Sequence, residues 1–121
     1  GYVANEKVKD LMSKSNILVV PSIWQEPFGM TAIEGLSNKM VVIASDVGGL
    51  SEIIKDKGVL IKDIDSRKLT TKLRELLNSS DEIKKYQSLA WDNYPFDQKK
   101  ISCLQDEIRR EIFTKFNNST Q

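Results

Sequence analysis

The sequence contains no histidine and only one cysteine, Cys103, among its 121 residues. Without histidine there is no triad built on a histidine base and no histidine metal ligand. A single cysteine cannot form an internal disulfide, which agrees with a reducing compartment. No apolar run approaches the roughly 20 residues that cross a bilayer, and the start of the chain lacks the apolar core of a signal peptide. We therefore expect a cytoplasmic protein.

An excess of charge of one sign is also lacking. The chain has 18 Lys and Arg residues against 17 Asp and Glu residues, which gives a formal net charge of +1. Nucleic-acid binding depends on clustered Lys and Arg side chains that neutralise phosphates. We therefore expect no nucleic-acid partner.

What the sequence has is a regular alternation of short apolar runs and amphipathic segments. Three runs rich in β-branched residues predict buried parallel strands over 17–20, 40–44 and 59–61. Apolar residues at helical spacing predict helices over 5–14, 30–37, 50–54, about 66–78, about 81–91 and about 97–116. The two glycines within 46–49 predict a turn. This alternation predicts an α/β fold with a Rossmann-like parallel sheet and helices on both faces.

Two glutamates, Glu26 and Glu34, stand where the strand over 17–20 gives way to a helix. Open α/β sheets bind ligands at such carboxyl ends of strands. A helix that starts near Gly29 leaves the N–H groups of its first turn available to an anion, and Thr31 adds a hydroxyl donor. Ionised carboxylates instead accept hydrogen bonds from hydroxyl groups. The pattern therefore predicts a diphosphate site between two hydroxyl-binding acids, which suits a sugar nucleotide.

Four segments form a wider pattern: Pro21–Ser22, Glu26–Glu34 (EPFGMTAIE), Val41–Ser45 (VVIAS) and Gly48–Ile54 (GGLSEII). In these segments the sequence resembles the donor-binding C-terminal domain of retaining glycosyltransferases with the GT-B fold. More narrowly, it resembles the large family that includes sucrose synthase and the lipopolysaccharide and capsule hexosyltransferases. The resemblance runs from Gly1 to about Phe113, and it implies the C-terminal half of a GT-B fold whose N-terminal strands are missing.

The resemblance assigns substrate binding to six residues: Glu26, Phe28, Gly29, Met30, Thr31 and Glu34. Glu26, which is also the residue assigned to catalysis, would contact hydroxyls of the donor sugar, and Glu34 would hold the ribose. The backbone N–H groups of residues 28–30 would face sugar and diphosphate, and Thr31 would bond the diphosphate. The turn at residues 48–49 resembles a family loop close to this site.

The resemblance also implies the reaction. The complete protein would bind a UDP- or GDP-type sugar and transfer the hexosyl group with retention to a polysaccharide or lipid-linked acceptor. It would need no metal and no cofactor, and it would work in the cytoplasm or as a peripheral protein at the inner face of the membrane.

Two aromatic residues, Trp24 and Phe28, lie in the predicted loop before the helix. Such residues more often pack or anchor a loop than stack on a sugar.

The sequence departs from the family in two places. Residues 35–40 (GLSNKM) replace the usual Ala- and Gly-rich run that ends in Gly-x-Pro. We expect Asn38 to take the left-handed conformation that glycine usually fills there. By this resemblance, the acceptor-binding N-terminal domain and the start of the donor domain, with an Arg and a Lys for the diphosphate, would lie outside the given sequence.

These observations predict two parts of the chain. Residues 1–96 would form a partial donor-binding Rossmann-like domain, and residues 97–121 a C-terminal crossover helix with a frayed polar tail. One face of that helix carries Ile101, Leu104, Ile108 and Ile112, so residues 97–116 could form a homodimer. The alternative function is a non-catalytic nucleotide-sugar-binding or structural module, inactive without its N-terminal domain.

Overall fold

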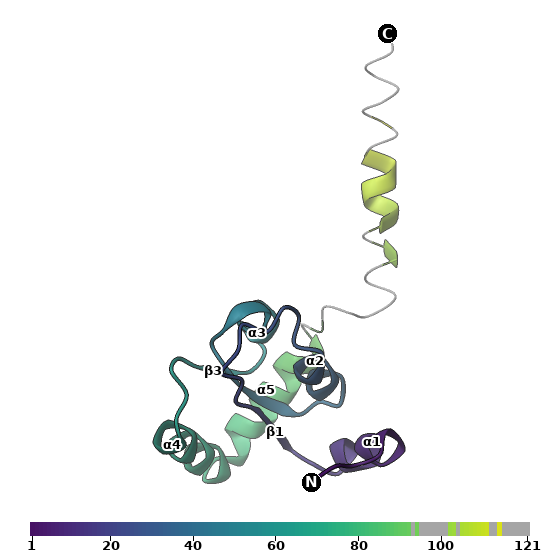
Figure 1. Cartoon of the computed structure of the whole chain (residues 1–121). Coiled ribbons are helices and arrows are strands. Elements are labelled where there is room, and N and C mark those ends of the chain that lie inside the picture. Colours follow the sequence, from purple (N-terminus) through teal and green to yellow (C-terminus); the bar gives the residue numbers. More distant parts are fainter. Residues whose placement is uncertain (93, 95–101, 104, 112–113, 115–121) are drawn as a thin grey trace.

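The computed structural model describes residues 1–92, 94, 102–103, 105–111 and 114 (Figure 1). Its elements follow in the order α1 (Asn5–Ser13), β1 (Ile17–Val20), α2 (Met30–Ser37), β2 (Val41–Ser45), α3 (Gly48–Ile54), β3 (Val59–Ile61), α4 (Ser66–Leu77) and α5 (Ser80–Asp92). The predicted α/β fold is confirmed. The predicted bounds of β1, α2 and β3 agree with the structure, and the ends of the other elements differ by one or two residues.

The three strands form one parallel sheet in the order β1-β2-β3. Ile17 pairs with Val41 at one end of the first ladder, and Ser45 pairs with Ile61 at one end of the second. All residues of the central strand β2 are buried. A strand buried on both faces reads in the sequence as a continuous apolar run, which is why β2 could be recognised there.

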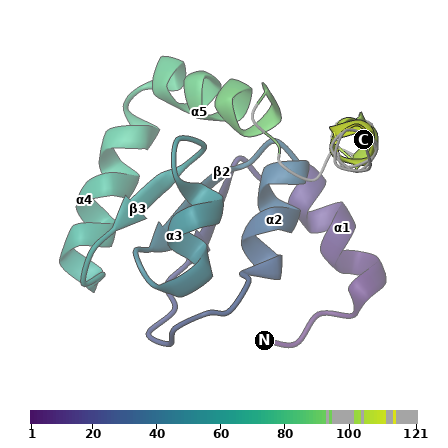
Figure 2. The ribbon, with the colours of Figure 1, turned by 90° about the horizontal axis from the view of Figure 1, so that it is seen from above.

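Side chains alternate between two apolar clusters because successive residues of a strand point to opposite faces. On one face, Val42 and Ala44 of β2 pack with α2, α3 and Ala90 of α5. On the other face, Val41 and Ile43 pack with Leu76 of α4 and with partly buried side chains of α5. Figure 2 shows α2 and α3 side by side, with α4 at the far end of the sheet. Helices therefore cover both faces, as predicted.

The start of α3 differs from the prediction. Residues 46–49 were expected to form a turn, but α3 begins at Gly48 after the extended residue Val47. The N–H of Leu50 donates to the carbonyl of Val47 at 3.2 Å, and the hydroxyl of Ser51 donates to Asp46 Oδ1 at 2.6 Å. These bonds draw both glycines into the first turn, although glycine has a low intrinsic helix propensity.

The predictions for the C-terminal segment fall largely outside the described residues. Residues 102–103, 105–111 and 114 are helical and exposed. Ile101, Leu104 and Ile112 of the expected apolar face, and the boundary at residue 96, lie outside the described part of the chain. Ile108 is described and is about half exposed. Within the described residues, no helix has the length and apolar character needed to traverse a bilayer.

Candidate functional site

The loop between β1 and α2 and the first turn of α3 meet at one edge of the sheet. Both segments follow the carboxyl ends of neighbouring parallel strands, β1 and β2. The N–H of Gly49 donates a hydrogen bond to the carbonyl of Glu26 at 2.7 Å. The six residues predicted from the sequence lie on this loop and on the first two turns of α2. The fold thus places them at the edge where parallel α/β sheets bind ligands.

The first turn of α2 presents two N–H groups that have no acceptor among the described residues. Gly29 is buried and left-handed, with φ +68° and ψ +48°, and no side chain in the part of the chain that the structure describes caps the helix. The N–H groups of Ala32 and Ile33 donate to the carbonyl of Gly29 at 3.0 and 3.2 Å. The N–H groups of Met30 and Thr31 have no acceptor within the described part of the chain. Together with the helix dipole they can bind an anion.

Glu26 is half-buried and is held at two points. Its carboxylate accepts a hydrogen bond from the hydroxyl of Ser22 at 2.7 Å, and its carbonyl accepts the bond from Gly49. An ionised carboxylate has about four lone-pair sites, so this group can accept further hydrogen bonds from a bound molecule. Sequence reasoning gave Ser22 no role of its own, although the residue stands in the pattern at the end of β1.

Glu34 is exposed in the second turn of α2, and its carboxylate has no partner among the described residues. Thr31 lies one turn earlier, also exposed, on the same side of the helix. Phe28 and Met30 are 49% and 57% exposed. The two glutamates therefore lie on either side of the open N–H groups in the sequence, one on the loop and one on the helix.

The end of α2 corrects one expectation. Asn38 is not left-handed, since its φ is −91°. The left-handed residue is Lys39, with φ +56°. The side chain of Asn38 instead donates to the carbonyl of Glu34 at 2.8 Å and caps the helix. The ammonium of Lys39 lies 4.3 Å from the centre of the Trp91 ring, a cation–π contact that accompanies this conformation.

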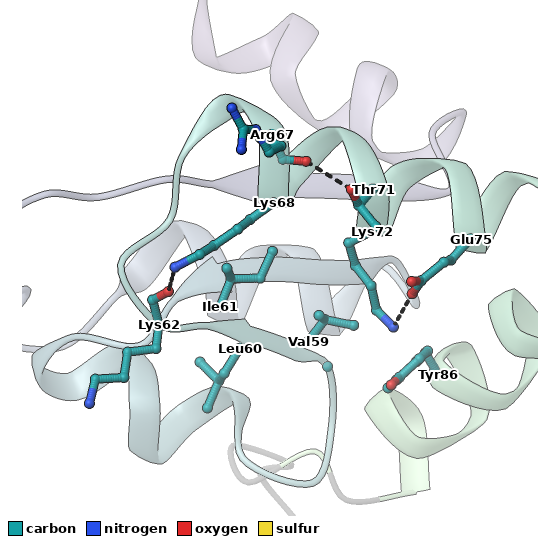
Figure 3. A pocket seen from close by; sticks show the side chains of 11 residues that line it. Val59, Leu60, Ile61, Lys62, Arg67, Lys68, Thr71, Lys72, Glu75 and Tyr86 are labelled. Atoms are coloured by element: carbon teal, nitrogen blue, oxygen red, sulfur yellow. Dashed lines mark hydrogen bonds and ion pairs between the residues drawn. The ribbon is translucent and has the colours of Figure 1, made fainter.

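A groove of about 660 Å³ lies elsewhere, between β3 and α4 (Figure 3). Arg67, Lys68 and Lys72 line it, but Lys68 donates to the carbonyl oxygens of residues 62 and 63 at 2.9 and 3.0 Å. Lys72 donates to Glu75 at 2.9 Å, and this bond is the main cause of a raised pKa of Lys72. None of the six predicted residues lines the groove, so it is separate from the candidate site.

Comparison with known proteins assigns the family. Residues 1–90 match the family described as glycosyl transferases group 1. The chain belongs to the group 1 glycosyl transferases. This group 1 chain is 42% identical over 83 residues to an uncharacterised glycosyltransferase of Methanocaldococcus jannaschii, a match that covers 67% of the chain and 23% of that protein. It is 32% identical over 77 residues to an alpha-maltose-1-phosphate synthase of Mycolicibacterium smegmatis, covering 60% of the chain and 20% of the relative.

A solved structure supports the same assignment. The group 1 chain is similar to sucrose-phosphate synthase from Thermosynechococcus elongatus, with a TM-score of 0.71 and 28% sequence identity. The match covers 95% of the chain and 30% of that protein. The resemblance to GT-B glycosyltransferases is thereby confirmed. The group 1 chain spans about a quarter of the length of the relatives it matches.

Proposed function

We propose that this chain is the nucleotide-sugar-binding part of a retaining hexosyltransferase. The observation that carries the proposal is the pair of open N–H groups on Met30 and Thr31, with a carboxylate on either side of them in the sequence. A diphosphate needs donors and positive potential, and a helix N-terminus supplies both. A sugar and a ribose offer hydroxyl groups, which carboxylates accept. Membership of the group 1 family supports the same class of ligand.

Each group has a separate role in this proposal. The N–H groups of Met30 and Thr31 and the hydroxyl of Thr31 bind the diphosphate, while residues 28–29 bring the backbone close to the sugar. Glu26, fixed by Ser22, accepts hydrogen bonds from hydroxyls of the donor sugar. Glu34, whose carboxylate is exposed, accepts those of the ribose. No step needs a metal, because the helix N-terminus stabilises the charge of the leaving diphosphate.

The proposed reaction keeps the configuration of the sugar. The bond between the anomeric carbon and the diphosphate oxygen breaks, and the acceptor oxygen bonds to that carbon from the same face. The acceptor proton passes to the leaving phosphate, which becomes the base. Glu26 is proposed to orient the sugar while positive charge develops on its ring, and it takes up no proton. Donors in fixed positions lower such a barrier because they need not reorganise as charge develops.

The test measures protection by the donor. In the complete protein, UDP-glucose or GDP-mannose should raise the unfolding temperature, because a ligand that binds only the folded state stabilises it. Glu34→Ala should abolish this protection. Glu6→Ala, which removes an exposed glutamate from the first turn of α1, should retain it. Unchanged protection in Glu34→Ala would show that Glu34 does not bind the donor. If no nucleotide sugar protects the unaltered protein, the proposal is wrong.

A further inference from the structure

Gly48 and Gly49 lie against the backbone of the loop that carries Glu26. A Cβ atom on Gly49 would stand 2.5 Å from the carbonyl oxygen of Pro27 and 3.1 Å from that of Glu26. A Cβ on Gly48 would stand 2.5 Å from the carbonyl oxygen of Glu26 and 3.0 Å from its nitrogen. Backbone atoms cannot move aside as the end of a flexible side chain can. The contact therefore exists only because neither residue has a side chain.

The two glycines meet different requirements. Gly48 has φ +50°, a conformation that costs other residues energy, so both its space and its backbone conformation favour glycine. Gly49 has no positive φ, but its N–H reaches the carbonyl of Glu26 at 2.7 Å, and only close approach of the two backbones permits this bond. A side chain at residue 49 would thus push the loop away without straining its own backbone.

The next residue, Leu50, extends the contact to the start of α2. A Cβ on Gly29 would stand 2.7 Å from Leu50 Cδ2, and Leu50 is fully buried. The first three residues of α3 therefore pack against the loop. The two glycines contact the carbonyl groups of Glu26 and Pro27, and Leu50 contacts Gly29, the N-cap of α2. The hydrogen bond from Ser51 to Asp46 at 2.6 Å fixes this turn of α3 to the end of β2.

We propose that Gly48 and Gly49 are positioning residues, which set where the carboxylate of Glu26 stands relative to the open N–H groups of α2. Ser22 acts with them, since its hydroxyl fixes the carboxylate while Gly49 fixes the carbonyl of the same residue. This inference rests on the proposed function, which makes Glu26 a donor-binding residue. The contact between the two glycines and the loop can nevertheless be tested without any donor. In this proposal the ligand-binding groups belong to the loop after β1 and to α2, and the first turn of α3 sets their geometry.

The first experiment compares two glycines that are equally crowded. Gly58 is the matched control, because its Cβ would stand 2.5 Å from the carbonyl oxygen of Val42 in the sheet and 3.0 Å from Ile54 Cγ2 at the end of α3, and neither residue belongs to the loop. In the 121-residue chain, Gly49→Ala should speed hydrogen exchange of the residue 49 amide and shift the amide resonances of residues 25–29. Gly58→Ala should destabilise the chain without changing either. The inference would be overturned if both variants changed the exchange rate of the residue 49 amide and the resonances of residues 25–29 equally, or if Gly49→Ala changed neither.

The second experiment avoids any variant that fails to fold. Ser22→Ala removes one hydroxyl from a half-buried position and should leave the complete protein folded at the temperature of the assay. It should raise KM for the nucleotide sugar or lower kcat by about tenfold, the factor expected when a hydrogen bond to a charged group is lost. Ser22→Thr keeps the hydroxyl and should restore both constants. If KM and kcat are unchanged in Ser22→Ala, Ser22 does not help to position Glu26.

Failure of the inference and failure of the proposed function give different results. If the unaltered complete protein binds no nucleotide sugar, the proposed function is wrong, and the exchange data still decide whether the glycines hold the loop. If it binds a nucleotide sugar and Gly49→Ala, folded at the temperature of the assay, binds it as tightly, the positioning role is wrong. A loss of about tenfold or more in donor affinity, absent in Gly58→Ala, supports it.

Discussion

Glu26 and Glu34 differ in how far they are ordered before any ligand arrives. Glu26 has its carboxylate bonded to Ser22 and its carbonyl bonded to Gly49. Glu34 is exposed and its carboxylate has no partner among the described residues. Ordering a long side chain on binding costs about 0.5–1.5 kcal/mol. In the proposed function this cost falls on the ribose side of the site, whereas the sugar side is already arranged.

The ion pair between Lys72 and Glu75 gives a prediction at the same scale. The hydrogen bond from Lys72 to Glu75 raises the pKa of Lys72 above 10.5, and burial opposes the rise. We expect Glu75→Gln to lower this pKa, as measured by NMR titration of the lysine side chain. Glu82→Gln is the control and should lower it less, because the carboxylate of Glu82 contributes the smallest of the effects that raise it.

The same pair should make stability depend on pH only at high pH, where Lys72 loses its proton. A group whose pKa is higher in the folded state stabilises the fold below its unfolded value and loses that contribution as the pH rises through the folded value. The contribution of this pair is therefore present below pH 10.5 and disappears above it. Because Glu75 is 53% exposed, we expect less than about 1 kcal/mol. A loss of stability between pH 6 and 8 that Glu75→Gln removes would contradict this assignment.

At the scale of elements, α4 begins at a side-chain cap. The carboxylate of Asp65 accepts a hydrogen bond from the N–H of Lys68 at 2.7 Å. Asp65→Ala should lower the free energy of unfolding by about 1 kcal/mol, the usual cost of losing such a cap. Urea denaturation of the 121-residue chain measures it. Asp65→Asn is the control, because asparagine caps about as well, and an equal loss in both variants would show that the cap is not the cause.

The elements also show what the sequence could predict. The bounds of β1 and β3 followed from apolar β-branched runs, because strands of a covered parallel sheet are buried on both faces. The start of α3 was missed because two glycines argue against a helix. The bonds from Leu50 to Val47 and from Ser51 to Asp46 are local in sequence, but residue type alone does not show that they form. Asn38 was expected to be left-handed from local preference, but Lys39 takes that conformation beside Trp91.

The candidate site was predictable to a similar degree. The strand–helix junction and its two glutamates follow from the order of residues, and the left-handed cap at Gly29 agrees with the predicted start of α2. The bond between Gly49 and Glu26 could not be predicted, because it depends on how closely the first turn of α3 approaches the loop in space. The bond from Ser22 is local in sequence, yet nothing in residue type distinguishes it from an ordinary serine after a strand.

At the scale of the whole molecule, the chain corresponds to about a quarter of its relatives, namely 23% of the Methanocaldococcus protein and 30% of the sucrose-phosphate synthase. A transfer reaction needs the acceptor held against the donor, and proximity supplies much of the acceleration. We therefore expect the purified 121-residue chain to transfer no sugar from UDP-glucose or GDP-mannose, as measured by release of the nucleoside diphosphate. The complete protein is the control, and transfer by the isolated chain above the rate of spontaneous hydrolysis would contradict the expectation.

The hydrogen bonds and close approaches described above for the loop join residues within 22–53, from the hydroxyl of Ser22 to the side chains that pack beneath Gly29. The entropy lost in closing a loop grows with the logarithm of its length, and chains rich in short-range contacts fold faster. The conformational cost of building this site is therefore small. Helices α4 and α5 come later in the sequence and complete the core. They therefore stabilise the fold that carries the loop, although they take no part in the contacts described for the loop.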